Sequence, residues 1–274
     1  MRQRLSARQL FWRGVLAAAA DVAMATGAYP WVPHLARAAL RRRGPPDEIG
    51  PALGVAAREW AVALAASAAR PIGFLGLPGA RGRGPRPIVM VHGYAMNRAN
   101  FVPLAARLAR AGLGPIVGFE YWTLGKTASA ARRLGRFVDE LRAATGAPQV
   151  DVIGHSMGGV VGRYYVTLGG GDGAVRNLIT IGSPHSGTDV SAIGIGRPAV
   201  ELVVGSSLMA RLEAARRPVH TRITVIGSRV DALVPAADQA PMAGVDSVVY
   251  PDLGHLSLLA SRRVAEAIIA RLRR

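Results

Sequence analysis

The sequence predicts an α/β protein with a mostly parallel six-stranded sheet flanked by helices, preceded by a helical N-terminal segment. With 274 residues, of which 50% are hydrophobic, the chain can bury the core of one large domain. From residue 86 onward, short apolar runs alternate with helix-patterned stretches, as strands and crossover helices do in a parallel sheet. Residues 1–80 are rich in alanine, leucine and arginine and show no alternating strand pattern.

Six predicted strands follow one another along the chain. They are residues 88–91, 116–119, 150–153, 175–181, 222–226 and 246–250. Residues 101–111 and 128–144 have helical patterns that end at Gly112 and Gly146. A closing helix begins after Ser261 and carries an apolar stripe along one side.

A glycine, proline and arginine stretch at residues 79–87 divides the chain, because neither a helix nor a central strand tolerates that composition. We therefore expect a helical N-terminal segment, residues 1–80, and an α/β domain, residues 81–274.

The start of the chain has the parts of a signal peptide: a basic beginning, an apolar middle and a small-residue pattern near residue 25. Asp21 interrupts that apolar stretch. Neither this stretch nor a second apolar run, residues 60–69, reaches the roughly 20 residues needed to span a bilayer. Packed helices, attachment at a membrane surface and a cleaved signal all stay open. A membrane-associated or secreted location is slightly favoured over a cytoplasmic one.

The net charge of +17 would normally indicate nucleic acid or an anionic membrane as a partner. Lys126 is the only lysine, however, and the excess of arginine, alanine and glycine is typical of GC-rich coding. Aromatic residues make up 5% of the chain, too few for a base-stacking surface, so we expect no nucleic-acid partner. The absence of cysteine excludes disulfides and thiolate chemistry, and we expect neither a metal nor a cofactor.

The clearest chemical motif is Gly-His-Ser-Met-Gly-Gly at residues 154–159, which matches G-x-S-x-G. A predicted strand precedes it and an apolar helical stretch follows it, which is the context in which this motif exposes a nucleophile. A sharp strand-to-helix turn lifts the serine hydroxyl above the sheet edge, and the flanking glycines leave room for that turn. The sequence therefore predicts Ser156 as a nucleophile.

A serine nucleophile needs a base, and the base needs a third group to orient it. Where this motif occurs, the three residues follow the chain order serine, acid, histidine. His255 is the one histidine that follows every predicted strand. His155 is adjacent to the serine and should point away from it; the remaining candidates, at a strand boundary or in the N-terminal segment, are His34, His92 and His220.

Asp231 is the preferred acid, because it lies just past the predicted strand at residues 222–226 and so at the same sheet edge as the serine. Asp238 lies further from its strand, and Asp252 lies only three residues before His255. Both remain alternatives.

Two backbone N–H groups should stabilise the oxyanion formed on attack. We expect one from Met157, which follows the nucleophile, and the other from Tyr94, in the loop after the first strand. The Tyr94 side chain and Met96 should line the substrate pocket. His92, beside that loop, is expected to be structural.

Four segments together resemble the bacterial triacylglycerol lipases and related esterases of the α/β-hydrolase superfamily. They are His92-Gly93, residues 154–165 including Arg163-Tyr164-Tyr165, residues 180–188 and Gly254-His255-Leu256. The resemblance covers about residues 86–270 and is less specific for the substrate than for the superfamily. It implies that residues 183–188 border the active site, so that His185 lines the substrate pocket or is structural. The single glycine before Tyr94 is similar to that of lipases that handle medium or long acyl chains.

The sequence departs from these lipases in two respects. The first two strands of larger members are missing, as in the smallest lipases, and a helical segment takes their place. No acidic cluster matches the structural calcium site that some relatives carry.

Residues 189–219 form an insertion that is either a mobile lid or a fixed cap. The predicted function is hydrolysis of a carboxylic ester or lipid through an acyl-enzyme on Ser156. One alternative is an acyltransferase or deacylase that acts on membrane lipids or lipid-linked glycans. Another is a catalytically silent hydrolase-like scaffold that binds a lipid or a partner. Nothing in the sequence predicts an oligomeric state.

Overall fold

The structure is a computed structural model that describes part of the chain in detail. The described residues are 49–74, 82, 84–189, 191, 195–215, 220–236, 238–239 and 245–274. The expected signal or membrane-attachment sequence near the start of the chain lies outside them. The described part of the N-terminal segment consists of helix α3 (Ile49–Ala69) and the 3-10 helix η2 (Arg70–Phe74). No helix among the described residues has the length and apolar character needed to cross a membrane.

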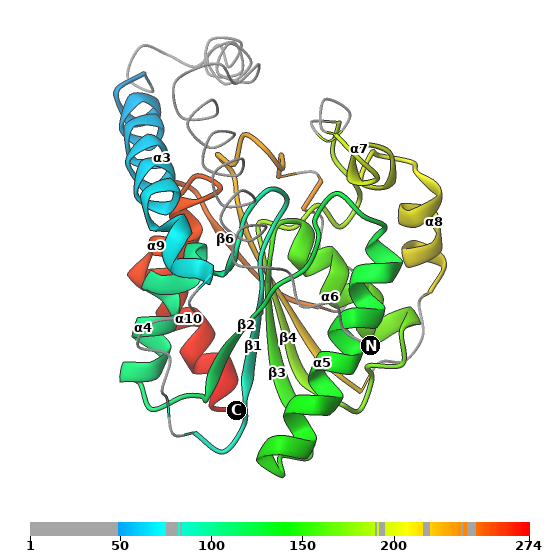
Figure 1. Cartoon of the computed structure of the whole chain (residues 1–274). Coiled ribbons are helices and arrows are strands. Elements are labelled where there is room, and N and C mark those ends of the chain that lie inside the picture. The colour runs from blue at the N-terminus through cyan, green and yellow to red at the C-terminus, as the bar shows by residue number, and fades with distance from the viewer. Residues whose placement is uncertain are drawn as a thin grey trace.

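Six parallel strands form one sheet in the order β2-β1-β3-β4-β5-β6 (Figure 1). They are β1 (Ile88–Val91), β2 (Ile116–Phe119), β3 (Val150–His155), β4 (Val175–Ile181), β5 (Arg222–Ser228) and β6 (Asp246–Tyr250). This confirms the predicted fold class and all six strands. β3 and β5 each extend two residues beyond the predicted apolar run. In β3 the added residues are Gly154 and His155, which stay extended because they pair with Thr180 and Ile181 of β4.

Helices cover both faces of the sheet, and Figure 1 shows the two layers. One layer contains α3, α4 (Val102–Arg110), α9 (Ser257–Ala260) and α10 (Arg262–Leu272), and the other contains α5 (Thr127–Thr145), α6 (Met157–Leu168) and α8 (Ser207–Ala214). A short 3-10 helix, η3 (Arg98–Phe101), precedes α4. Helix α9 begins two residues after His255 and was not expected from the sequence.

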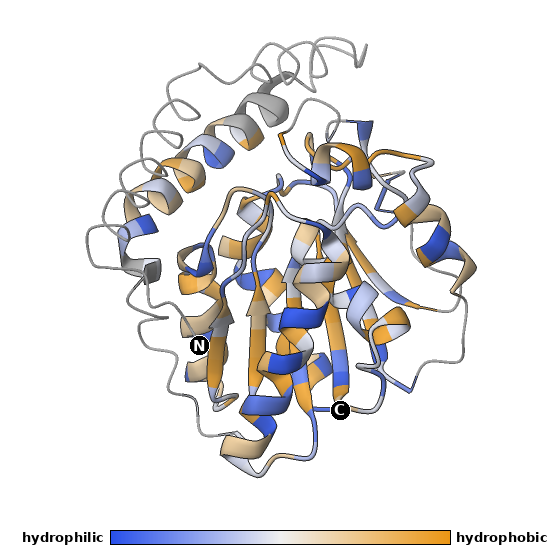
Figure 2. Ribbon diagram, turned by 45° about the vertical axis from the view of Figure 1, so that its right-hand side comes forward, coloured by the Kyte–Doolittle hydropathy of each residue, from blue (hydrophilic) through white to orange (hydrophobic). Residues whose placement is uncertain are grey.

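The two cores follow from the alternation of side chains along each strand. In β1, Ile88 and Met90 pack into the cluster that includes α4 and α10, while Val89 and Val91 pack into the cluster that includes α5 and α6. Because both faces are covered, all four residues are buried. Figure 2 shows the largely apolar strands at the centre of the molecule, between the helical layers.

The insertion contains α7 (Pro198–Glu201) and α8, and contacts tie both to the rest of the domain. The buried Arg163 of α6 donates hydrogen bonds to the carbonyl oxygens of His185 (2.8 Å) and Leu212 (3.0 Å). The Thr127 N–H donates to the Glu201 carboxylate at 2.8 Å. These hydrogen bonds join the described part of the insertion to α5 and α6.

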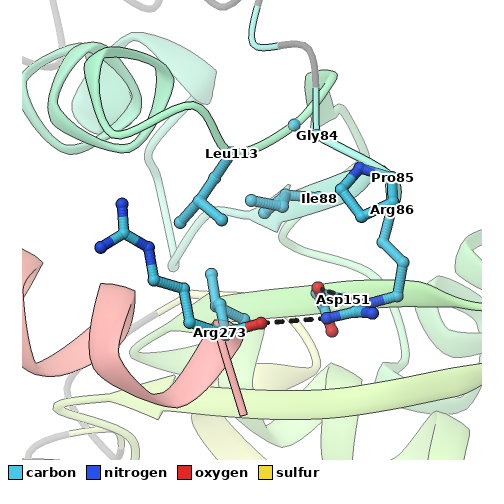
Figure 3. Close-up of a pocket in the computed structure, with 9 residues that line it drawn as sticks. Gly84, Pro85, Arg86, Ile88, Leu113, Asp151 and Arg273 are labelled. Atoms are coloured by element: carbon cyan, nitrogen blue, oxygen red, sulfur yellow. Dashed lines mark hydrogen bonds and ion pairs between the residues drawn. The ribbon is translucent and has the colours of Figure 1, made fainter.

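A cavity of about 260 Å³ lies near the amino-terminal ends of β1 and β3, far along the strands from the predicted nucleophile. Figure 3 shows Arg86 reaching to Asp151 at this site. Burial raises the pKa of Asp151, although Asn177, at 2.6 Å, and Arg86, at 3.3 Å, act in the opposite direction. The Arg86 guanidinium also donates to the Leu272 carbonyl oxygen at 2.9 Å. Arg86 thus links Asp151 of β3 to the end of α10.

Candidate active site

Ser156 occupies the turn between β3 and α6, with φ 54° and ψ −127°. A non-glycine residue at positive φ costs of the order of 1–3 kcal/mol, and such strain is concentrated at functional sites. The Ser156 N–H donates to the Ile181 carbonyl oxygen at 2.8 Å, which fixes the turn against β4. The structure therefore gives the motif the strained geometry that the sequence predicted.

The glycines around Ser156 permit close packing of α6 on the strands. A Cβ on Gly154 would lie 2.6 Å from the Gly159 nitrogen, and one on Gly158 would lie 2.1 Å from the Val91 carbonyl oxygen. A Cβ on Gly159 would lie 2.0 Å from Ser183 Oγ. Any side chain at these three positions would push α6 away from β1 and β4 and displace the turn that carries Ser156.

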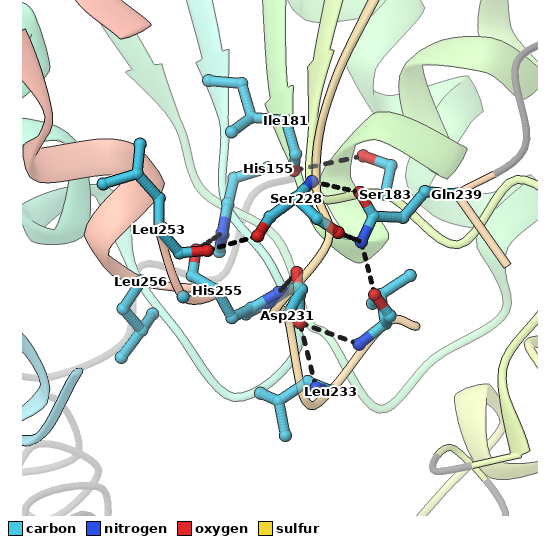
Figure 4. Close-up of polar contacts among 12 residues, drawn as sticks. His155, Ile181, Ser183, Ser228, Asp231, Leu233, Gln239, Leu253, His255 and Leu256 are labelled. Atoms are coloured by element: carbon cyan, nitrogen blue, oxygen red, sulfur yellow. Dashed lines mark hydrogen bonds and ion pairs between the residues drawn. The ribbon is translucent and has the colours of Figure 1, made fainter. Parts of the chain in front are cut away.

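Asp231 and His255 come together at the carboxyl edge of the sheet, 24 residues apart in the chain. Both are buried, and His255 Nδ1 lies 2.7 Å from Asp231 Oδ2 (Figure 4). The other oxygen of Asp231 accepts hydrogen bonds from the N–H groups of Leu233 and Val234, both at 2.9 Å. These bonds fix the carboxylate, which in turn fixes the tautomer and orientation of His255.

The environment of His255 raises its pKa above the usual 6.5. Burial alone would lower it, but the negative charge of Asp231 and its hydrogen bond to the ring outweigh that effect, and Glu59 adds to them. The site therefore stabilises the protonated form of the His255 imidazole, the form that results when a base accepts a proton.

His155 has a role that the sequence did not predict. Its buried Nε2–H donates to the His255 carbonyl oxygen at 3.1 Å, and the two ring centroids are 4.6 Å apart. Burial, followed by the nearby His255, lowers the pKa of His155 well below 6.5, so it remains a neutral donor. His155 thus fixes the backbone of His255 through this hydrogen bond.

The alternative acids have other partners. Both oxygens of Asp252 lie 2.6 Å from the Arg263 guanidinium, whose hydrogen bond lowers the Asp252 pKa. Asp238 is half-buried and bonded to the Thr188 side chain, and burial raises its pKa. Of the three aspartates considered from the sequence, Asp231 is the one in contact with His255.

The loop after β1 runs directly beside the nucleophile. A Cβ on Gly93 would lie 2.9 Å from Ser156 Cβ and 3.2 Å from Met96 Sδ. Ala95 has φ 53°, so this loop is also sharply turned. The Tyr94 hydroxyl accepts from the Ile195 N–H at 2.8 Å and donates to its carbonyl oxygen at 3.0 Å, which joins the loop to the insertion.

The two expected oxyanion donors belong to the residues that follow Ser156 and Gly93 in the chain. Met157 is the first residue of α6, so its N–H lies in the first turn, where helical N–H groups lack intrahelical acceptors. Tyr94 immediately follows Gly93, where an added Cβ would lie 2.9 Å from Ser156 Cβ. Behind this loop, His92 donates to the Gly93 carbonyl oxygen at 3.0 Å, and its own carbonyl accepts from Tyr121 at 2.7 Å. These contacts agree with a structural His92.

The other predicted site histidine, His185, is buried beside β4. Its Nε2 forms a hydrogen bond with Thr180 Oγ1 at 2.9 Å. Burial, with the charge of Arg163, lowers its pKa to about 3. Of the two roles that the resemblance implied, these contacts favour the structural one. Across the residues that the structure describes, no three histidine or carboxylate side chains are grouped as metal ligands.

Two further residues touch the Asp231–His255 pair. Gly182 follows β4 with φ 54°, and a Cβ there would lie 3.2 Å from Asp231 Oδ2 and 3.3 Å from His255 Nδ1. Glu59 of α3 accepts the backbone N–H groups of Leu256 and Ser257. No sequence motif marks Glu59, whereas Gly182 lies within the segment that resembles the lipases.

Comparisons with known proteins give the same fold class. Residues 86–196 match the family model for the alpha/beta hydrolase fold. Over 53 residues, or 19% of this chain, the sequence is 42% identical to triacylglycerol lipases of Pseudarthrobacter phenanthrenivorans and Burkholderia plantarii. The match spans 16% and 14% of those two proteins, well under two thirds of their lengths.

A solved structure has the same fold over most of its length. The mature form of a Bacillus licheniformis lipase superposes with a TM-score of 0.60 at 14% identity, covering 68% of this chain and 91% of the lipase. The chain therefore has the α/β-hydrolase fold. In sequence it resembles bacterial triacylglycerol lipases over one short segment.

Proposed function

We propose that this protein hydrolyses carboxylic esters through an acyl-enzyme on Ser156. The observation that supports this most directly is the buried Asp231–His255 pair, 2.7 Å apart, at the sheet edge where the strained turn presents Ser156. An activated serine, a base and an orienting acid are the groups that acyl transfer requires.

In the first half-reaction, His255 accepts the proton of the Ser156 hydroxyl as the Oγ attacks the ester carbonyl carbon. The carbonyl oxygen becomes an oxyanion, which the N–H groups of Tyr94 and Met157 stabilise. His255 then donates its proton to the leaving alcohol as the ester C–O bond breaks. The acyl group remains on Ser156.

In the second half-reaction, His255 accepts a proton from water, and the hydroxide oxygen attacks the acyl carbon. The same two N–H groups stabilise the second oxyanion. The bond to Ser156 Oγ breaks, the proton returns to this oxygen, and the carboxylic acid leaves. Asp231 stabilises the charged imidazole in both halves. No cofactor takes part.

We propose that exposed apolar side chains near the loop beside Ser156 contact the acyl group of the substrate. Trp122 is 58% exposed and Ile195 is 73% exposed. Their segments adjoin, because the Arg197 N–H donates to the Leu124 carbonyl oxygen at 3.0 Å. Tyr94 ties Ile195 to the loop beside Ser156. An acyl chain leaving the serine in this direction would meet apolar side chains.

Labelling with a fluorophosphonate, which reacts with activated serines, tests the proposal on the full chain. We expect covalent label on the wild type and on Ser129→Ala, a matched change at a half-buried serine of α5, and no label on Ser156→Ala. Hydrolysis of nitrophenyl esters of rising chain length should follow the same pattern. An unlabelled wild type, or equal label on Ser156→Ala, would overturn the proposal and favour a silent scaffold.

Hydrolysis and acyl transfer pass through the same acyl-enzyme. They differ in the molecule that accepts the acyl group, which is water in hydrolysis and another alcohol in acyl transfer. In the presence of an added alcohol, we expect free carboxylic acid to remain the main product. A predominance of the new ester would show that the enzyme is an acyltransferase.

A further inference from the structure

The N-terminal helix α3 reaches the loop that carries His255, although the two are nearly 200 residues apart in the chain. The Glu59 carboxylate accepts the Leu256 N–H at 2.9 Å and the Ser257 N–H at 2.6 Å. The Ser257 hydroxyl also donates to it. One carboxylate therefore binds the two residues that immediately follow the proposed base.

The same carboxylate also fixes the residue before His255. Ser257 Oγ, while donating to Glu59, accepts the Gly254 N–H at 3.2 Å. Gly254 has no side chain, which the packing requires, because a Cβ there would lie 2.3 Å from Glu59 Cγ. The loop is thus tied to α3 on both sides of His255.

Together, three side chains from separate parts of the fold hold His255. Asp231 binds the ring, His155 binds the carbonyl oxygen, and Glu59 binds the amides that follow. The ring can reach the serine only if its backbone is held in register, since displacement of a catalytic group by about 1 Å can cost 100-fold in rate.

Other contacts dock the same N-terminal segment on the domain. Arg58 donates to the Asp252 carbonyl oxygen at 3.1 Å, just before the His255 loop. The Asn97 side chain donates to the Arg70 carbonyl oxygen at 2.8 Å, next to the loop that carries Tyr94. Residues 49–74 therefore touch the loops on both sides of the proposed reaction centre.

We propose that Glu59 is a positioning residue for the proposed hydrolysis, and that α3 belongs to the catalytic unit. This inference rests on the proposed function, because it assigns Glu59 a role through His255. Its carboxylate holds the histidine loop in place for proton transfer. Its negative charge also favours the protonated imidazole that forms during catalysis.

The charge effect can be measured because few titratable groups face His255. Among the described residues they are Asp231, His155 and Glu59. Asp231 is unchanged in a Glu59 variant, and His155 is held neutral by burial. Loss of the Glu59 charge should therefore lower the pKa of His255 and move the acid limb of the pH–rate profile to lower pH.

The test compares Glu59→Gln with Glu266→Gln in the full chain. Both remove one carboxylate charge, and Glu266 is an exposed residue of α10 paired with Arg262. In the glutamine variant, an amide N–H₂ faces one of the donors that the carboxylate accepted. On a soluble nitrophenyl butyrate, we expect kcat about 10- to 100-fold lower, KM changed less than about twofold and the acid limb at lower pH. Glu266→Gln should match the wild type.

The possible failures can be told apart. If the wild type takes no fluorophosphonate label, the proposed function itself fails, and the role of Glu59 with it. If the wild type is labelled but folded Glu59→Gln keeps the wild-type kcat, or loses kcat with an unmoved acid limb, then Glu59 is at most structural and the proposal is overturned.

If Glu59→Gln does not fold, Ser257→Ala decides the question. This variant removes only the hydroxyl that links Glu59 to the Gly254 N–H. We expect a severalfold fall in kcat at unchanged KM, and an unchanged kcat overturns the proposal.

Discussion

Gly182 offers a sharp test of how tightly the Asp231–His255 pair is packed. In Gly182→Ala, the new Cβ would lie 3.2 Å from Asp231 Oδ2 and 3.3 Å from His255 Nδ1. Contacts at this distance require the neighbours to move by a few tenths of an ångström. Since the backbone of Ser156 is fixed on β4, such a shift misaligns the base relative to the nucleophile.

The control for this change is Gly170→Ala. Gly170 also has positive φ, 78°, but a Cβ there meets nothing within 4 Å. Both alanines carry the left-handed backbone strain of about 1–2 kcal/mol, and both restrict the unfolded chain equally. The difference between the two variants therefore isolates the crowding of the pair.

We expect both variants to lose stability in thermal unfolding, and Gly182→Ala to lose more because of the added crowding. In hydrolysis of a soluble nitrophenyl ester, Gly182→Ala should have kcat about tenfold lower, whereas Gly170→Ala should match the wild type. If the two folded variants had equal kcat, the pair would be either looser than the contacts indicate or unnecessary for the reaction. The reasoning would then be refuted.

Three further predictions follow from the same contacts. Asp231→Asn should lower kcat by about 10⁴, because Asp231 contacts His255. Asp252→Asn should leave kcat unchanged, because Asp252 pairs with Arg263. Nitrophenyl ester kinetics would contradict this if the two effects were reversed. The rate should fall as pH drops through the His255 pKa, because the base must be neutral to act. Since Asp231 raises that pKa, the half-maximum of kcat/KM should lie above pH 6.5. A half-maximum below pH 6.5 would show that the effect of burial on the His255 pKa is the larger one. Leu134→Ala, in the core between α5 and the sheet, should destabilise the protein by about 2–5 kcal/mol in denaturant unfolding with little change in kcat of the folded fraction.

The fold was predictable because its signals are local. β1 lies in a short apolar run whose four residues are all buried, and α5 ends where Gly146 adopts φ 69°. The turn at Ser156 was equally predictable from the sequence, since a strained turn between a strand and a helix requires a particular local sequence.

The partners of His255 were legible only in part. Asp231 was predictable from its place after a strand, because parallel strands deliver their carboxyl ends to one edge of the sheet. The same reasoning left Asp238 and Asp252 as alternatives. Only the side-chain contacts distinguish the three, since local sequence does not specify which carboxylate faces the ring.

The sequence by itself thus determined the six-stranded fold and the turn that presents Ser156. Only the tertiary structure decided that Glu59, His155 and Gly182 surround His255. Glu59 meets Ser257 across 198 residues, and His155 meets the His255 carbonyl across 100. Such contacts depend on how α3 and β3 pack against the histidine loop, and periodicity and turn chemistry, which act over a few residues, carry no record of that packing.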